Sequence, residues 1–235
     1  MLNVDDYIQT YVRKSKQMEA YKIAIELWDL LLVLDKNGFV REKVSGDVLE
    51  KRGLHIAIAK NADKIIASFN KVYSLYFEEK KTEEFQEFMK HFGIYDYDLI
   101  HIINSQLIFD YLLDTESFKN ILLFMLKGIK PRMPLGRLFT ELQKITKDTS
   151  EAQKISNHIN INLRNSLAHF LFREENDTIF YYTHEKNGDW WTLKETPIKA
   201  SELLDKSGEI SLLRAILACM ITDWYGLPVV PKTLP

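Results

Sequence analysis

The most informative stretch of the sequence is NHININLRNSLAHF, from Asn157 to Phe170. At 100° per residue its apolar side chains share one side of a helix: Ile159, Leu163, Leu167 and Phe170. Its polar side chains share another side: His158, Asn162, Asn165 and His169. A solvated helix face normally carries Lys and Glu, whereas this one carries only His and Asn. The pattern predicts one continuous helix over about 151–172 with a polar face suited to directional hydrogen bonding.

Helical spacing of apolar residues extends outward from this stretch in both directions. With nine Gly and six Pro in 235 residues, the chain has few breaks. The spacing predicts helices at about 5–34, 54–77, 97–113, 118–126, 135–146 and 210–224, with a short helix beginning at Thr82. A hairpin is expected near 178–193, because two segments rich in aromatic and β-branched residues flank the turn sequence EKNG.

These elements predict an all-α fold with a single β-hairpin after the helix at 151–172. Short connections between successive helices favour an up-and-down bundle. We expect two parts, an N-terminal helical extension over 1–92 and a helical bundle over 93–235.

Composition excludes several classes of protein. The net charge of −2 is not that of a globally basic nucleic-acid binder, so any polyanion site must be local. The single cysteine, Cys219, cannot form an intrachain disulfide, and no Cys/His spacing suggests zinc. The apolar runs are interrupted by charged residues, and the first 30 residues do not read as a signal peptide. We expect a cytoplasmic protein with no metal, cofactor or membrane partner.

The sequence RNSLAH from Arg164 to His169 resembles the signature of HEPN domains. In that signature an arginine, usually followed by a polar residue such as Asn, precedes a histidine with four to six residues between them. The segment LGRLFTEL, from Leu135 to Leu142, resembles the helix that often comes before the motif. The resemblance covers about 93–226 and implies a helical bundle with metal-independent endoribonuclease activity, in prokaryotic defence or as a toxin.

The residue types of the motif suit RNA cleavage. RNA carries its own nucleophile, the 2′-OH, so the protein must supply a proton acceptor and a fixed cation. We expect His169 to accept the proton and Arg164 to bind the phosphate oxygens. Asn165, one turn before His169, is expected to orient the imidazole. The expected products carry a 2′,3′-cyclic phosphate and a 5′-OH.

Five further residues are candidates for binding RNA. His158 and Asn162 extend the polar stripe, and Lys130, Arg132 and Arg137 form a basic region before the motif. A solvated face explains the basic region about as well.

The spacing of the motif also predicts an assembly. Arg164 and His169 lie about 140° apart on a straight helix, so two motifs facing each other in a homodimer would form a composite site. RNA is expected to tighten this dimer. In HEPN toxins controlled by a nucleotidyltransferase antitoxin, a tyrosine follows two residues after the histidine, where this chain has Leu171. The difference argues against that partner and leaves another antitoxin or regulatory partner open.

Two other functions fit the sequence. The chain could be a non-catalytic HEPN-like module that binds a nucleotide, forms a dimer or regulates a partner. It could also be a helical scaffold in which Arg164 and His169 are structural.

Overall fold

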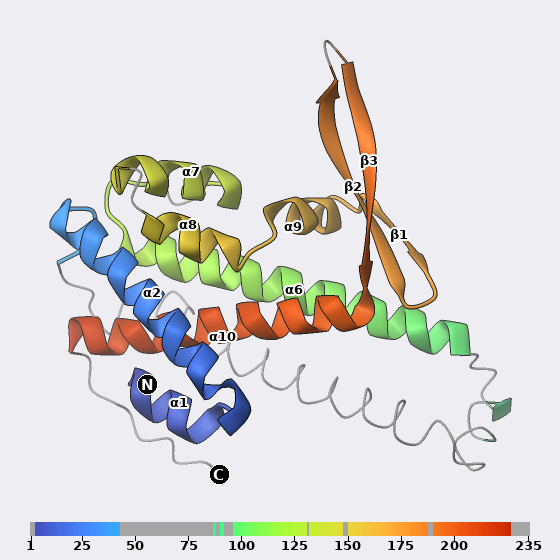
Figure 1. Cartoon of the computed structure of the whole chain (residues 1–235), viewed down its shortest axis with the longest axis horizontal. Helices are drawn as coiled ribbons and strands as arrows, with labels where there is room; N and C mark the ends of the chain where they lie inside the picture. The colour runs from blue at the N-terminus through green and yellow to red at the C-terminus, as the bar shows by residue number, and fades with distance from the viewer. Residues whose placement is uncertain are drawn as a thin grey trace. The chain divides into compact units, whose positions relative to one another are not determined.

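The computed structural model describes residues 3–42, 87, 90–91, 96–130, 132–147, 150–187 and 190–226 (Figure 1). The helices are α1 (Val4–Tyr11), the 3-10 helix η1 (Lys14–Lys16), α2 (Gln17–Lys36), α6 (Asp96–Met125), α7 (Leu135–Ile145), α8 (Ser150–Asn157), α9 (Ile161–Ala168) and α10 (Ala200–Tyr225). The strands are β1 (Phe172–Glu175), β2 (Thr178–Asn187) and β3 (Trp190–Lys199). The helices expected at 54–77 and from Thr82, and the expected domain boundary at 92/93, lie outside the described residues.

The prediction of an all-α fold is wrong, because the chain also forms a three-stranded antiparallel sheet in the order β1-β2-β3. The expected hairpin forms as β2 and β3, and its strands reach Asn187 and Lys199, well beyond the aromatic segments that predict it. No sequence pattern predicts β1, whose first residue, Phe172, is the last residue of the helix expected at 151–172. β1 pairs with β2 across a two-residue turn at Asn176 and Asp177. Asn176 takes φ 53° there, a left-handed conformation that asparagine tolerates.

Two compact units make up the chain, and each combines distant segments. Unit 1 contains residues 1–55, 114–161 and 208–235, and unit 2 contains residues 56–113 and 162–207. Helices α6 and α10 each contribute one part to unit 1 and the other to unit 2.

In unit 1, α2 supplies a large part of the apolar core. Its buried side chains recur at helical spacing: Ala20, Ile23, Ala24, Leu27, Leu30, Leu31 and Leu34. α2 packs against α1 and α8, and α8 packs against α7. A buried ion pair joins α10 to α6, with Arg214 Nε 2.7 Å from Asp114 Oδ1. Hydrophobic burial therefore forms the core around one specific pair of charges.

In unit 2, β2 and β3 form a long twisted ribbon (Figure 1). Ile179 and Tyr181 on β2, and Ile198 on β3, are buried on one face near the base of the ribbon. The other face is exposed further out, where Trp191 and Leu193 are more than half exposed. The alternation of strand side chains thus gives the ribbon one packed face at its base.

Several helix boundaries differ from the sequence predictions. The helix expected at 5–34 is divided, because Val12 takes an extended conformation and the side chain of Gln17 donates to the Ile8 and Val12 carbonyls. Conversely, the break expected after Leu113 is absent, because Asp114 and Thr115 are buried within a continuous α6. The polar residues Asp114 and Thr115, where the sequence suggests a break, are helical residues whose side chains are buried.

In the segments that the structure describes, no helix has the length and apolar character needed to cross a membrane.

Candidate ribonuclease site

The end of helix α9 holds the three residues expected to be catalytic. Arg164 and Asn165 lie within α9, and His169 follows its last residue. Asn165 and His169 are exposed, and Arg164 is half-buried. On the opposite side of the helix, Leu163, Ser166 and Leu167 are buried. The Asn165 amide and the His169 imidazole therefore face solvent, whereas the other side of α9 is buried.

A left-handed turn ends α9 directly after His169. Phe170 takes φ 57°, and its backbone N–H donates to the Leu167 carbonyl at 3.2 Å. The Leu171 N–H donates to the Ser166 carbonyl at 2.8 Å. These two hydrogen bonds form a Schellman cap, with His169 at the C-cap and Phe170 in the left-handed position usually taken by glycine.

The same turn is fixed to the sheet. Ser166 Oγ donates to the Tyr182 carbonyl at 2.5 Å, and the Tyr182 N–H donates to the Leu171 carbonyl at 2.9 Å. One bond involves Ser166 within the motif and the other involves Leu171 just after it, and both join Tyr182 of β2. The backbone around His169 is thus held by the sheet as well as by its own helix.

Asn165 contacts the arginine of the motif. Arg164 Nη1 donates to Asn165 Oδ1 at 3.2 Å, whereas the backbone carbonyl of Asn165 accepts the His169 N–H at 3.1 Å. Among the described residues, the Asn165 side chain makes no hydrogen bond to the His169 imidazole. In this structure Asn165 orients the guanidinium instead of the imidazole.

The continuous helix expected at 151–172 is interrupted at 158–160. At the end of α8, the His158 N–H donates to the Ile155 carbonyl and the Ile159 N–H donates to the Ser156 carbonyl. Both bonds span three residues, as in a 3-10 helix, instead of the four of an α-helix. Ile159 turns into the core, where it is almost fully buried. The predicted apolar stripe also fails at Phe170, which is exposed because the helix has already ended.

His158 is consequently separated from the rest of the predicted polar stripe. Its Nδ1 lies 2.5 Å from Glu209 Oε1 and its Nε2 lies 2.7 Å from Glu26 Oε2. The hydrogen bond to Glu209 is the main cause that raises the pKa of His158, burial opposes it, and the bond to Glu26 adds to the increase. Both ring nitrogens are engaged within unit 1, so this side chain has no free atom for RNA. Asn162 remains on the exposed side of α9 with Asn165 and His169.

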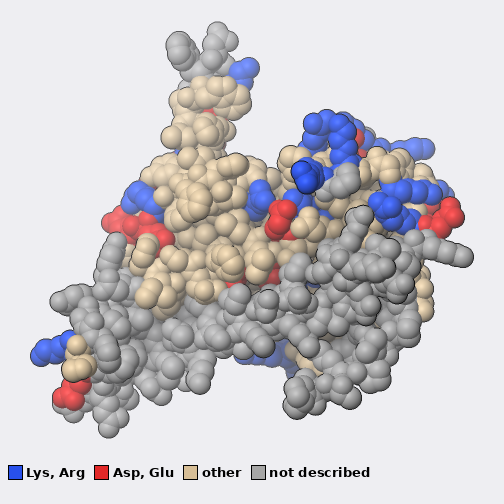
Figure 2. Space-filling view, turned by 180° about the vertical axis from the view of Figure 1, so that it is seen from behind, with Lys and Arg blue, Asp and Glu red and all other residues tan. Residues whose placement is uncertain are grey.

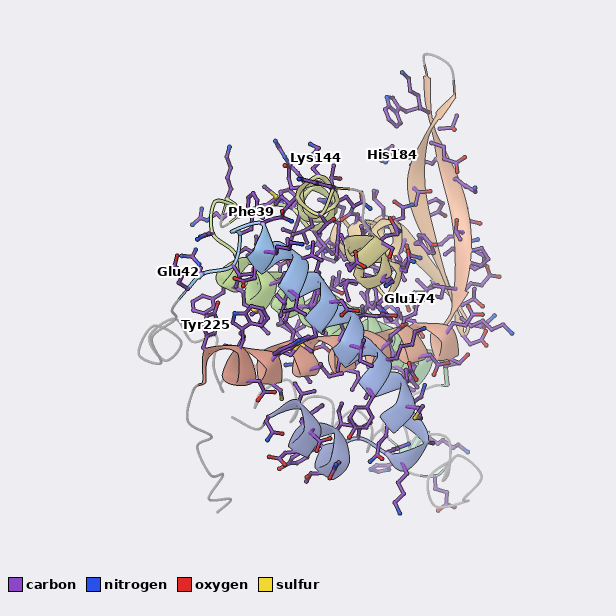
Figure 3. The ribbon with its side chains drawn as sticks, turned by 60° about the vertical axis from the view of Figure 1, so that its left-hand side comes forward. Phe39, Glu42, Lys144, Glu174, His184 and Tyr225 are labelled. Carbon is purple, nitrogen blue, oxygen red and sulfur yellow. The ribbon has the colours of Figure 1, made fainter. Side chains whose placement is uncertain are left out.

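The three basic candidates lie in unit 1, whereas Arg164, Asn165 and His169 belong to unit 2. Lys130 and Arg132 precede α7, and Arg137 lies on it; all three are exposed. Figure 2 shows Lys and Arg side chains gathered on the side of the molecule where α7 lies. Lys144 extends this group along α7 and pairs with Glu141 (Figure 3). The role of these residues in binding RNA stays a prediction.

Unit 2 contains two polar clusters that the sequence does not predict. Arg173 on β1 donates to both oxygens of Glu195 on β3, and the Tyr182 hydroxyl donates to the same carboxylate. The bond to Glu195 raises the pKa of Arg173, and the bond from Arg173 lowers the pKa of Glu195. The network crosses all three strands beside the turn that carries His169. Strand register brings these residues together, and no local sequence signal predicts it.

The second cluster lies between α6 and β1. His101 Nδ1 lies 2.8 Å from Glu174 Oε2, and Asn104 Nδ2 donates to the same oxygen at 3.3 Å. Figure 3 shows Glu174 at the base of the ribbon and His184 further out on it. Within the described ranges, no three His, Cys, Asp or Glu side chains are arranged to hold a metal ion.

Comparison of the chain with protein-family models, with curated proteins and with solved structures finds no match.

Proposed function

We propose that this chain is a metal-independent endoribonuclease of the HEPN type. The observation that carries the proposal is the end of α9, where an exposed histidine follows an arginine whose guanidinium is bonded to the adjacent asparagine. The cap and the two bonds to Tyr182 fix the backbone of this segment, as a site that must position a phosphate requires.

The proposed reaction is an internal transfer at phosphorus. His169 accepts the proton of the ribose 2′-OH, and the 2′-oxygen forms a bond to phosphorus while the bond to the 5′-oxygen breaks. The departing 5′-oxygen takes up a proton, which leaves a 2′,3′-cyclic phosphate and a 5′-OH. Arg164, oriented by Asn165, stabilises the negative charge that grows on the other phosphate oxygens.

A homodimer would complete this chemistry. One imidazole cannot be neutral, to accept the 2′-OH proton, and at the same time protonated, to donate a proton to the departing 5′-oxygen. Two copies of His169 can divide these tasks. The α-helical bond from the His169 N–H to the Asn165 carbonyl keeps Arg164 and His169 about 140° apart, as on a straight helix. We therefore propose that two motifs face each other and that RNA tightens the dimer.

The setting that fits this activity is a cytoplasmic defence or toxin system, controlled by an antitoxin or another regulatory partner. The alternative is a HEPN-like module that binds a nucleotide without cleaving RNA. It is favoured by the half-buried state of Arg164, since a guanidinium held by the protein can also serve as a fixed anchor for a phosphate.

The test is cleavage of single-stranded RNA by the purified full chain in EDTA. His169→Ala should abolish cleavage with an unchanged helical circular dichroism spectrum. His184→Ala is the matched control, because His184 is another exposed histidine of unit 2, and it should retain activity. Cleavage that requires Mg²⁺, or that persists in His169→Ala, contradicts the mechanism. Binding of RNA by a wild-type protein that never cleaves it supports the alternative.

The assembly is tested by sedimentation with and without a 2′-O-methyl oligonucleotide, which lacks the nucleophile. We expect a dimer that becomes tighter with the oligonucleotide. A monomer at micromolar concentration in both conditions contradicts the composite site.

A further inference from the structure

Phe170 combines two features that rarely occur together in one residue. Its backbone lies in the left-handed region at φ 57°, and its side chain is 83% exposed. It directly follows His169 and forms the C′ position of the cap that ends α9.

The left-handed conformation is unfavourable for a bulky L-residue, and glycine is the usual solution at this position. Burial of the phenyl ring does not offset that cost, because most of the ring is in water. Lys147 takes the corresponding position after α7, at φ 52°, but its positive charge is favourable at the C-terminal end of a helix. Phe170 has no such electrostatic benefit. Its presence beside the motif therefore calls for a role outside the stability of the fold.

We propose that Phe170 forms a nucleobase subsite of the active site, on which an unpaired base of single-stranded RNA stacks. The inference rests on the proposed ribonuclease function. An exposed aromatic ring offers a π-face to any base, so this subsite binds without strong sequence preference. Phe170 directly follows His169 in the chain, so we place the stacked base in a nucleotide next to the phosphate served by His169.

The rigid cap explains how the ring could be held for this purpose. Phe170 N–H and Leu171 N–H are both bonded to carbonyls of α9, and the Leu171 carbonyl is bonded to Tyr182 of the sheet. The backbone on both sides of the ring is thus fixed before RNA binds, which lowers the entropy lost on stacking.

The first experiment measures the affinity of the full chain for a non-cleavable 2′-O-methyl oligonucleotide by fluorescence anisotropy. Phe170→Leu keeps an apolar side chain but removes the π-face, and it should weaken binding roughly 5- to 100-fold. Phe170→Trp should restore binding to the wild-type level or better. Phe109→Leu is the control, because Phe109 is also an exposed phenylalanine of unit 2, and it should bind as the wild type does.

A second variant separates stacking from folding. Glycine adopts the left-handed conformation without strain, so Phe170→Gly should raise the midpoint of thermal unfolding. The same variant lacks the ring, so it should still bind RNA more weakly. Loss of affinity in a protein that has become more stable cannot be attributed to misfolding. If Phe170→Gly instead lowers the midpoint, the ring stabilises the fold and the inference is wrong.

A third measurement locates the base. Oligonucleotides that each lack one base, at successive positions, are compared for binding to the wild type. Loss of the base that stacks on Phe170 should weaken wild-type binding most, and loss of the same base should not change the affinity of Phe170→Leu. With cleavable RNA, Phe170→Leu should raise KM more than it lowers kcat.

The outcomes distinguish this inference from the proposed function. A wild-type enzyme that cleaves RNA, together with a Phe170→Leu variant of equal affinity and equal KM, overturns the stacking subsite and leaves the ribonuclease intact. A wild-type protein that neither binds nor cleaves RNA overturns both.

Discussion

His158 Nδ1 lies 2.5 Å from Glu209 Oε1, and the other ring nitrogen of the same histidine faces Glu26. The three side chains join the turn after α8 to α2 and α10 within unit 1. Because protonated imidazole donates from both nitrogens, the charged form of His158 is the one that satisfies both carboxylates. The raised pKa of His158 follows from these two bonds.

The raised pKa of His158 predicts how the stability of the protein depends on pH. With its pKa raised in the folded state, His158 contributes stability that is fully present below the ordinary histidine pKa of about 6.5. The contribution is lost as the pH rises through the folded-state pKa. Urea unfolding at a series of pH values from 5.5 to 8.5 should therefore show a free energy of unfolding that falls toward the alkaline end.

The control is His158→Gln, in which this dependence should be reduced because no proton is taken up at the position. A wild-type free energy of unfolding that rises over the same interval contradicts the assignment. A variant with the full wild-type slope places the pH dependence at another group.

The second prediction concerns the buried pair Asp114 and Arg214. Both side chains are almost fully buried, with Nε to Oδ1 at 2.7 Å. Asp114→Ala leaves the Arg214 guanidinium buried without its carboxylate, and it should lower the free energy of unfolding by about 3–5 kcal/mol. Urea unfolding measures the change.

The matched comparison replaces both charges, as Asp114→Leu with Arg214→Met. Because no unpaired charge then remains in the core, the double variant should recover most of the stability lost in Asp114→Ala. If both proteins are equally destabilised, packing at these positions matters more than the charge pair.

The third prediction compares two glycines that have open space for a Cβ but different backbone conformations. Gly208 lies inside α10, and a Cβ added there meets nothing within 4 Å. Gly208→Ala should raise the free energy of unfolding by about 0.5–1 kcal/mol, because alanine favours the helix. Gly38 has equal space but φ 76°, so Gly38→Ala should lower the free energy by about 1–2 kcal/mol. Two changes of the same sign would show that available space outweighs conformation.

The fourth prediction concerns how Arg164 acts. If the guanidinium binds the phosphate through two parallel donors, Arg164→Lys should lose most of the cleavage rate although the charge is kept. Asn165→Ala removes the acceptor that holds Arg164 Nη1, and it should lower kcat roughly 5- to 10-fold, as expected for one hydrogen bond of about 1 kcal/mol. Single-turnover cleavage of one defined RNA measures both effects.

Asn120→Ala is the control for the variants Arg164→Lys and Asn165→Ala, because Asn120 is an exposed asparagine outside the motif. An Arg164→Lys variant with wild-type turnover would mean that the arginine acts as a point charge. An Asn165→Ala variant with wild-type turnover would show that Arg164 does not need this partner.

Patterns with a short period in the sequence determined part of this structure. The amphipathic spacing after Pro134 predicts α7 to within one residue at its C-terminal end. The two aromatic segments around EKNG predict the β2 and β3 hairpin, and the motif places Arg164, Asn165 and His169 on one segment. These features depend on neighbours a few residues apart, where the repeat of the helix or strand itself selects which side chains are buried.

The remaining features depend on contacts between segments that are far apart in the sequence. Whether the helix continues through 158–160 depends on the burial of Ile159 and on carboxylates 132 and 51 residues away from His158. The same holds for the continuity of α6 at Asp114, which needs Arg214 of α10, and for β1, which needs the edge of β2. The sequence determined which residues are candidates for the chemistry, whereas long-range partners decided where the helices break and removed His158 from the polar stripe. A hydrogen bond or ion pair between distant segments leaves no period in the chain, so no sequence pattern predicts it.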